Sequence, residues 1–287
     1  MIELQPIVST DGRYHVRQQL VPPVVYLDTW AIREFSENEA LGSRFRGALL
    51  RTCGTLALSD INLIEFTTFE LPHNAEAAGR FTDSLLPHLF LMKCDPGKVI
   101  EREEAHLAGR LDQSPAGDER ALVQFAEAAA RRGGRFSMAT WFNIVHTERD
   151  RLKGQLPAIA EVFYAQLRRL RAELQKEPLS LAPVAYRDQI ALGRPPTQQL
   201  MRAVVDVLQR DRRVSETTNN AVDLLHTIVP GAYCDFVLLD GQWADRLKRA
   251  MTRLSEAGIP MRLRATYSNR NGGVEKFLQA LEAWPGC

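Results

Sequence analysis

Four acidic residues occupy positions from which an α/β fold could bring them together. Asp28 and Asp240 each follow a short apolar run, VVYL and FVLL, while Glu65 and Asp223 lie in stretches with helical periodicity. Mg²⁺ and Mn²⁺ prefer carboxylate oxygens as ligands. A pair of such ions can activate water and neutralise the charge that develops when a phosphodiester is hydrolysed. These residues therefore predict metal-dependent hydrolysis, with Asp28, Glu65 and Asp223 holding one ion and Asp240 holding a second ion or positioning water.

The stretch 219–240, NNAVDLLHTIVPGAYCDFVLLD, combines a predicted helix with a predicted buried strand. Its apolar residues recur at helical spacing, and Asp223 and His226 fall together on another side of that helix. Pro230 and the glycine after it are predicted to end the helix. The run FVLL does not alternate, which is typical of a parallel strand covered on both faces. Asp240 then lies just beyond the carboxyl end of a strand, where sites in open α/β sheets are found.

Further strands and helices alternate near the two ends of the chain. The sequence predicts strands over 24–27 and 55–58, each followed by a helix, over 30–35 and 61–69. This order is typical of a parallel α/β sheet. An edge strand is predicted over 261–266, because apolar and basic residues alternate there.

The middle of the chain shows mostly helical periodicity. Predicted helices span 77–90, 102–111, 119–132, 136–149, 156–175 and 197–210, and two more follow the sheet segments at 243–257 and 274–283. Leu89 to Met92 can instead form a short strand. The domain prediction is a core made of 20–72 and 215–287, with a helical insertion over 73–214.

Composition excludes little. The chain has 287 residues, of which 45% are hydrophobic and 25% charged, and a net charge of +1, so global charge gives no argument for nucleic acid. The cysteines are scattered, which disfavours a disulfide framework or a zinc site and favours a reducing cytoplasm; they are Cys53, Cys94, Cys234 and Cys287. The first residues lack the pattern of a signal peptide, and no apolar run is long enough to span a membrane.

Three segments, VVYLDTW, ALSDINLIEF and NNAVDLLHTIVPGAYCDFVLLD, resemble in this order the signature of the PIN-domain family of metal-dependent nucleases. The resemblance implies a three-layer α/β/α core with a central parallel sheet, and Mg²⁺ or Mn²⁺ as cofactor. Carried over residue by residue, the family's acids are Asp28, Glu65, Asp223 and Asp240, which would be both catalytic residues and metal ligands.

The same resemblance extends to neighbouring positions. His226 matches a pattern common among members and is predicted to contact phosphate or to orient Asp223, while Thr29 matches the residue after the first acid. Trp30 departs from the pattern, since an Asn is more usual there, and the segment between Glu65 and Asp223 is much longer than in compact members. The family implies an endoribonuclease first, and in bacterial settings a toxin held inactive by an inhibitory protein partner. The alternatives are an inactive scaffold that binds nucleic acid or protein, and a flap-type DNA nuclease.

Three of the four acids also have an explanation that involves no metal. Asp28 can cap the helix that follows it. Glu65 can be a solvated residue of an amphipathic helix, and Asp223 can be favoured by the dipole of a helix start. His226 alone is more often a buried histidine with satisfied hydrogen bonds than a catalyst. Asp235, just before the strand, is predicted to be structural.

Basic residues after Asp240 could supply a surface for the substrate. Thr29 and three residues of the helix after Asp240 are the predicted substrate-binding set; those three are Arg246, Lys248 and Arg249. Arginine and lysine provide most of the sequence-independent affinity for nucleic acid. Arg210 and Arg253 extend this basic character, but all of these residues can equally belong to solvated helix faces balanced by acids such as Asp206.

Overall fold

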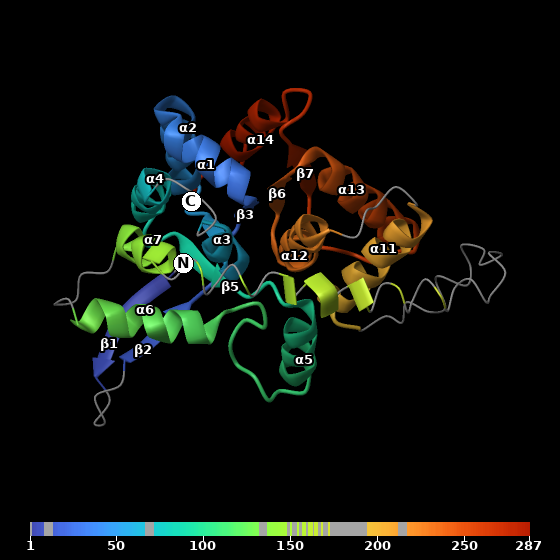
Figure 1. The fold of residues 1–287 in the computed structure, drawn as a ribbon, viewed down its shortest axis with the longest axis horizontal. Coiled ribbons are helices and arrows are strands. Elements are labelled where there is room, and N and C mark those ends of the chain that lie inside the picture. The colour runs from blue at the N-terminus through green and yellow to red at the C-terminus, as the bar shows by residue number, and fades with distance from the viewer. Residues whose placement is uncertain are drawn as a thin grey trace.

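The structure is a computed structural model that describes residues 2–8, 14–66, 72–131, 137–147, 194–211 and 217–287, together with scattered positions between 150 and 172. Its centre is a five-stranded parallel sheet with the order β5-β4-β3-β6-β7 (Figure 1). The strands are β3 (Val24–Leu27), β4 (Thr55–Ser59), β5 (Leu89–Met92), β6 (Phe236–Leu239) and β7 (Ala265–Ser268). The fold is therefore α/β with a parallel sheet, as the sequence predicts.

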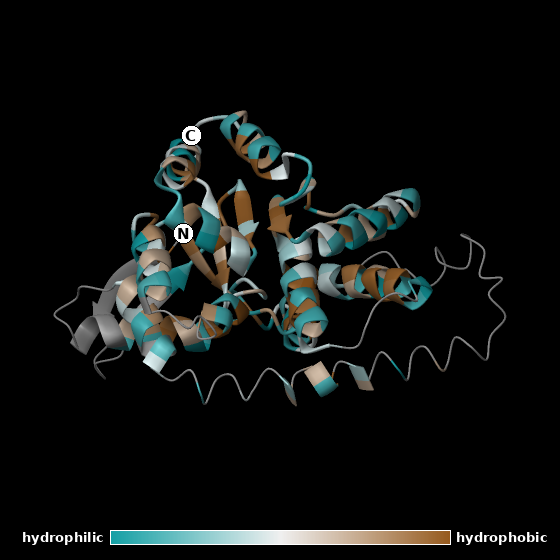
Figure 2. Ribbon diagram, turned by 45° about the horizontal axis from the view of Figure 1, so that its top comes forward, coloured by the Kyte–Doolittle hydropathy of each residue, from teal (hydrophilic) through white to brown (hydrophobic). Residues whose placement is uncertain are grey.

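Successive residues of each strand enter two different cores. In β3, Val24 and Tyr26 pack into one core, whereas Val25 and Leu27 pack into the other. Side chains alternate between the faces of a sheet, so continuous apolar runs such as VVYL and FVLL require helices on both sides. Figure 2 shows these strands in brown, with helices packed around them.

Helices cover both faces of the sheet. One core contains residues of α5 (Pro96–Leu107), α11 (Pro196–Arg210), α12 (Thr218–Tyr233) and α13 (Gly241–Glu256). The other contains residues of α1 (Thr29–Glu37), α2 (Glu39–Arg51), α4 (Pro72–Asp83), α6 (Glu119–Arg131), α7 (Met138–Thr147) and α14 (Gly273–Glu282). The short helix α3 (Asp60–Phe66) sends residues into both cores. An antiparallel pair of strands, β1 (Ile2–Val8) and β2 (Tyr14–Gln18), was not predicted.

The order of strands creates a topological switch point between β3 and β6. From β3 the chain continues outward to β4 and β5, whereas from β6 it continues in the opposite direction to β7. A topological switch point is the place where the chain leaves two neighbouring parallel strands in opposite directions. Ligands bind at such points in open α/β sheets. Asp28 follows β3 and Asp240 follows β6, so both acids lie at this switch point.

Three predicted elements were wrong. The last strand covers Ala265–Ser268 and not 261–266, because the carbonyl of Asp235 binds the N–H groups of Arg264 and Ala265 and pairing begins only there. The helix α12 continues through Pro230 to Tyr233, where buried apolar contacts outweigh the missing proline N–H. The predicted helix 77–90 is replaced by α4, which ends at Asp83, and by the strand β5.

The sheet takes one strand, β5, from the range assigned to the helical insertion. That part of the chain also supplies α5 and α11, which pack on the core of the sheet. The predicted boundary between core and insertion stays a prediction. Most of the predicted helix 156–175 lies outside the described residues.

A disulfide joins Cys53 to Cys287, which contradicts the expectation that the cysteines stay unpaired. The pair is 234 residues apart in sequence, and the two residues meet because the chain end returns to the end of α2. There Arg51 donates to the carbonyls of Glu282 (2.5 Å) and Trp284 (3.2 Å). Cys94 and Cys234 are free and buried. A cytoplasmic location stays a prediction, and in the described part of the chain no helix is both long and apolar enough to cross a bilayer.

Candidate metal centre at the carboxyl edge of the sheet

Asp28 lies at the N-cap position of α1 but does not act as its side-chain cap. Its backbone carbonyl accepts hydrogen bonds from Ala31 N–H (2.9 Å) and Ile32 N–H (3.0 Å). Within the described first turn of α1, its carboxylate makes no capping hydrogen bond. Only 7% of the residue is exposed. The capping explanation for this buried acid therefore fails.

Asp240 occupies the same position after β6 and does cap its helix. One carboxylate oxygen, Oδ1, accepts hydrogen bonds from Gln242 N–H (2.6 Å) and Trp243 N–H (2.9 Å) at the start of α13. The two acids at the switch point thus have the same place in the fold and different contacts. Asp240 is held rigidly by its helix, and it remains close enough to Asp28 and Asp223 to raise the pKa of both.

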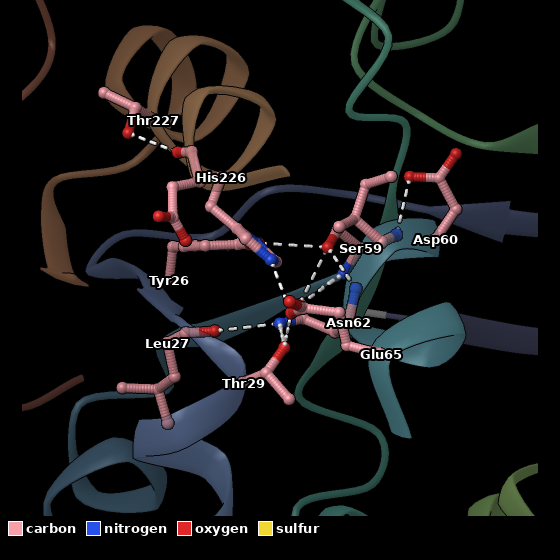
Figure 3. Close-up of polar contacts among 11 residues, drawn as sticks. Tyr26, Leu27, Thr29, Ser59, Asp60, Asn62, Glu65, His226 and Thr227 are labelled. Atoms are coloured by element: carbon pink, nitrogen blue, oxygen red, sulfur yellow. Dashed lines mark hydrogen bonds and ion pairs between the residues drawn. The ribbon is translucent and has the colours of Figure 1, made fainter. Parts of the chain in front are cut away.

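Glu65 reaches toward this edge from α3. Its Oε2 accepts hydrogen bonds from the Thr29 hydroxyl and is 2.7 Å from His226 Nε2 (Figure 3). The Glu65 side chain is 25% exposed. It therefore points into the site and is not the solvated face residue of the alternative reading.

His226 is completely buried and connects the site to the interior of the protein. Its Nδ1 contacts the Tyr26 hydroxyl, which is 3.0 Å from Ser59 Oγ, and its Nε2 faces Glu65 (Figure 3). A side chain with no exposed surface and both ring nitrogens engaged does not reach a phosphate. His226 instead orients Glu65, a different acid from the one expected in the sequence analysis.

Asn62 fixes the two strand–helix junctions relative to each other. Its amide nitrogen donates to the Leu27 carbonyl (3.3 Å) and to the Thr29 hydroxyl (3.0 Å), and its amide oxygen accepts from Ser59 N–H (3.0 Å). The end of β3 and the end of β4 are therefore tied together by one buried side chain. Sequence reasoning missed Asn62, Tyr26 and Ser59; only the spacing from Ser59 to Asn62, typical of a local capping contact, gave a signal.

Asp223 lies in the second turn of α12 and not in its first, because the helix begins at Thr218 with Thr217 as its N-cap. The favourable field of a helix dipole falls off within the first turn, so it does not explain this acid. Burial raises the pKa of Asp223 to about 7, and repulsion by Asp28 and Asp240 adds to the increase.

The charges of the site are coupled. Burial raises the pKa of Asp28 to about 6, with His226 opposing and Glu65 adding to the shift. Burial would by itself lower the pKa of His226, but the carboxylates of Glu65, Asp28 and Asp223 together outweigh it and raise the value to about 9. Burial likewise opposes ionisation of Glu65, yet the charge and hydrogen bond of His226 leave its pKa lowered. His226 and Glu65 therefore form an ion pair, while Asp28 and Asp223 keep raised pKa values although His226 partly offsets their repulsion.

The residues present fit a hard divalent ion. One ligand atom each from Asp28, Glu65 and His226 lie within 4.8 Å of one another. Asp28 and Glu65 offer carboxylate oxygens of the kind that Mg²⁺ and Mn²⁺ prefer, and Asp223 and Asp240 are coupled to Asp28. His226 is engaged at both ring nitrogens and supports Glu65 as its ion-pair partner. A cation between these acids would remove the repulsion that raises their pKa values. Whether Asp223 and Asp240 are ligands stays a prediction.

The predicted substrate-binding residues divide into two groups. Thr29 is buried against Glu65, and Arg246 is only 6% exposed, lies 3.5 Å from Asp211 and stacks over Trp243. Lys248 and Arg249, in contrast, are exposed on α13. The related residues Arg210 and Arg253 both pair with Asp206. Much of the basic character in this region is thus neutralised by acids of the same protein.

In comparisons with known proteins, no family model matches the chain, and no curated protein and no solved structure matches it either. The class that fold and site define is an α/β protein with an acidic centre at its topological switch point. Its function is argued from that centre.

Proposed function

We propose that this protein is a Mg²⁺- or Mn²⁺-dependent nuclease with a PIN-like core, acting as an endoribonuclease. The observation that carries the proposal is the approach of Asp28 and Glu65 at the carboxyl edge of the sheet, where one ligand atom of each lies within 4.8 Å of the other and of His226. In agreement with this geometry, burial and mutual repulsion raise the pKa of Asp28 and of Asp223. Buried like charges destabilise a fold unless a cation or a function accounts for them. A divalent ion accounts for them here.

The residues divide into ligands and supports. Asp28, Glu65 and Asp223 would hold the better-bound ion, and Asp240, with one oxygen committed to its helix, would hold a second ion or water. Such ions supply a metal-activated water and neutralise charge on the phosphate. Tyr26 and Asn62 keep His226, Thr29 and hence Glu65 in place. Rigid support of this kind is what a metal site requires beyond its ligands.

Cleavage of RNA tests the proposal. Purified protein with Mn²⁺ or Mg²⁺ is expected to cut single-stranded or structured RNA, to leave 5′-phosphates, and to stop when EDTA is added. Asp28→Asn is expected to lower the rate at least ~100-fold, because one missing ligand disrupts the shared ion. The matched control is Asp245→Asn, which removes one carboxylate from an exposed position of α13 and should keep the wild-type rate.

A DNA arm in the same assay separates the flap-type nuclease from the ribonuclease. Cleavage that survives the double change Asp28→Asn and Asp223→Asn would contradict the proposal. The toxin role, which rests on the family resemblance alone, predicts that expression arrests growth of a host cell and that Asp28→Asn abolishes the arrest.

One contact favours a second candidate, a scaffold that binds nucleic acid or protein without cleaving. His226 neutralises Glu65 through its Nε2 at 2.7 Å, so part of the acidic centre is satisfied without any ion. If no RNA or DNA is cut with either metal while the protein still binds one of them, the scaffold becomes the better description.

A further inference from the structure

The loop between β7 and α14 brings an arginine to the same edge of the sheet as the acidic centre. Leu239 at the end of β6 is paired with Ser268 at the end of β7, so the residues after both strands emerge side by side (Figure 1). Asp240 follows the first strand and Arg270 follows the second. Arg270 is exposed, and its side chain makes no hydrogen bond or ion pair with any residue that the structure describes.

Gly241 shows how closely Arg270 approaches this edge. A Cβ placed on Gly241 would lie 2.3 Å from Arg270 Nε, 2.5 Å from its Cδ and 2.7 Å from its Cζ. The arginine therefore lies flat against the backbone of the first residue of α13, directly after Asp240. A residue with any side chain at position 241 would displace it.

The backbone of the loop sets this position. Asn271 and Gly272 have φ angles of 54° and 69°, which form a left-handed turn. Gly273 N–H donates to the Arg270 carbonyl (2.9 Å), and a Cβ on Gly273 would lie 2.1 Å from the Ser268 carbonyl oxygen. Only glycine allows that approach. The loop is therefore built tightly around Arg270.

Three other arginines of this part of the molecule are committed to acids. Arg246 pairs with Asp211, and Arg210 and Arg253 pair with Asp206. Arg270 differs from them because its charge is not neutralised by the described part of the chain. Four carboxylates repel a polyanion that approaches them, and a cation beside them attracts the polyanion and offsets part of this repulsion.

We propose that Arg270 is a substrate-contacting residue that binds a phosphate of the RNA next to the acidic centre, and that Gly241 provides the space in which its side chain lies. This inference rests on the proposed function, and it names a phosphate contact that the sequence analysis did not predict. A guanidinium binds phosphate through two parallel hydrogen bonds, which fixes the orientation of the backbone as well as adding affinity.

Four variants test the proposal against a fluorescein-labelled single-stranded RNA oligonucleotide. They are Arg270→Ala, Arg270→Lys, Gly241→Ala and, as a matched control, Arg46→Ala, which removes an exposed arginine of α2. Binding is measured by fluorescence anisotropy with Ca²⁺ over a range of salt concentrations, and cleavage is measured with Mn²⁺. Thermal denaturation of each variant verifies that it is folded.

Arg270→Ala is expected to weaken binding about tenfold, the loss of one charge-assisted phosphate contact, and to reduce the salt slope by about 0.7. Arg270→Lys should recover part of the affinity, because it keeps the charge and loses the fork of donors. Gly241→Ala should weaken binding in the same direction with an unchanged melting temperature, since it keeps the arginine but moves it. Arg46→Ala should bind like the wild type.

The outcomes separate this inference from the proposed function. If the wild type cleaves RNA while Arg270→Ala and Gly241→Ala bind and cleave as it does, the phosphate contact is wrong and the nuclease stands. If the wild type binds RNA without cutting it and Arg270→Ala weakens that binding, the nuclease proposal fails and the contact stands. Failure of the wild type to bind RNA overturns the contact.

Discussion

Two buried aspartates at opposite edges of the same sheet are treated very differently by the fold. Asp235 precedes β6 at the amino edge and is 4% exposed; Asp28 follows β3 at the carboxyl edge and is 7% exposed. Asp235 accepts a hydrogen bond from Val24 N–H (2.7 Å), pairs with Arg262 (3.1 Å) and lies 4.0 Å from Arg264. Asp28 has His226 and the Thr29 N–H as favourable neighbours but faces repulsion from Glu65 and Asp240.

Under the proposed function, this difference separates the structural charge of Asp235 from the metal-binding charge of Asp28. Burial costs a carboxylate its hydration, and arginines with a backbone N–H replace that hydration around Asp235. Asp28 is similarly buried, but its neighbours include further acids, and among the residues that the structure describes no arginine pairs with it as with Asp235. The fold therefore concentrates negative charge at this position. Proteins maintain such an arrangement where an ion or a substrate completes it. Burial alone would not have distinguished the two residues.

The largest effect expected from this comparison is on stability. Asp235→Ala should lower the free energy of unfolding by about 3 kcal/mol, because it removes the partner of Arg262 and leaves Val24 N–H without an acceptor. Asp28→Asn should leave the free energy unchanged or raise it, since it removes one of several like charges. Urea denaturation at pH 7 with EDTA measures both. Equal destabilisation by the two changes would contradict the assignment of Asp28 to a functional site.

A bound metal ion should make the acids at the carboxyl edge of the sheet stabilising, because it neutralises their repulsion. Mn²⁺ at about 100 times its dissociation constant should stabilise the wild type by about 2.7 kcal/mol, because only the folded protein presents the assembled ligands. Asp28→Asn should lose most of this stabilisation, and Asp245→Asn, an exposed control on α13, should keep it. Melting curves with Mn²⁺ and with EDTA provide the measurement. If Mn²⁺ stabilises Asp28→Asn as much as the wild type, the metal does not bind at Asp28.

The pH dependence of the free energy of unfolding also reports on the charges of Asp28 and Asp223. The pKa values of Asp28 and Asp223 are raised from 3.8 to about 6 and about 7. A raised carboxyl binds its proton more tightly in the folded state, so its contribution is fully present below pH ~4 and is lost as the pH rises through the folded value. Without metal, the wild type should therefore lose stability between about pH 4 and pH 7, on the order of 1–3 kcal/mol for each carboxyl.

The matching variant isolates this effect. Asp60, whose pKa burial and Asp118 raise to about 6, contributes with the same sign in wild type and in Asp28→Asn, so its part cancels in the difference. Asp28→Asn should flatten the decline, because it also removes a charge that raises the pKa of Asp223. His226, with its pKa raised to about 9, contributes stability that is present below about pH 6.5 and lost as the pH rises through 9. Urea denaturation from pH 4 to 8 in EDTA measures the free energy of unfolding of wild type and Asp28→Asn. The two curves should converge at low pH, where Asp28 is protonated.

Local patterns in the sequence were sufficient to place Asp28 and Asp240 at strand ends. Runs such as VVYL and FVLL followed by Asp28 and Asp240 define strand ends, and strand ends of a parallel sheet share an edge. The last strand was misplaced because its start depends on the Asp235 carbonyl of a neighbouring strand, which no local pattern encodes. The sequence allows both a helix and a strand at 89–92, because a short apolar run fits either equally well.

Contacts between distant residues could not be predicted. Tyr26 and His226 are 200 residues apart, and the sequence alone allowed His226 to contact phosphate or to orient Asp223. The contact with Tyr26 instead holds His226 in the interior, where it supports Glu65. The sequence predicts that Arg246 binds the substrate, but in the structure it is buried against Asp211 and the Trp243 ring. The space that Gly241 leaves for Arg270 exists only once β6 and β7 lie side by side. Tertiary packing, and not residue type, decides each of these roles.

The smallest expected effect concerns the two acids that share the N-cap position. Asp240→Ala should be about 1 kcal/mol less stable than Asp240→Asn, because asparagine still accepts the Gln242 and Trp243 N–H bonds and alanine does not. Asp28→Ala and Asp28→Asn should differ by only a few tenths of that amount, since the Asp28 side chain caps nothing in the first turn of α1 as the structure describes it. Both pairs compare two neutral residues, so the change in charge cancels within each pair. Urea denaturation of the four variants in EDTA provides the measurement, and an equal difference in both pairs would show that Asp28 caps its helix as Asp240 does.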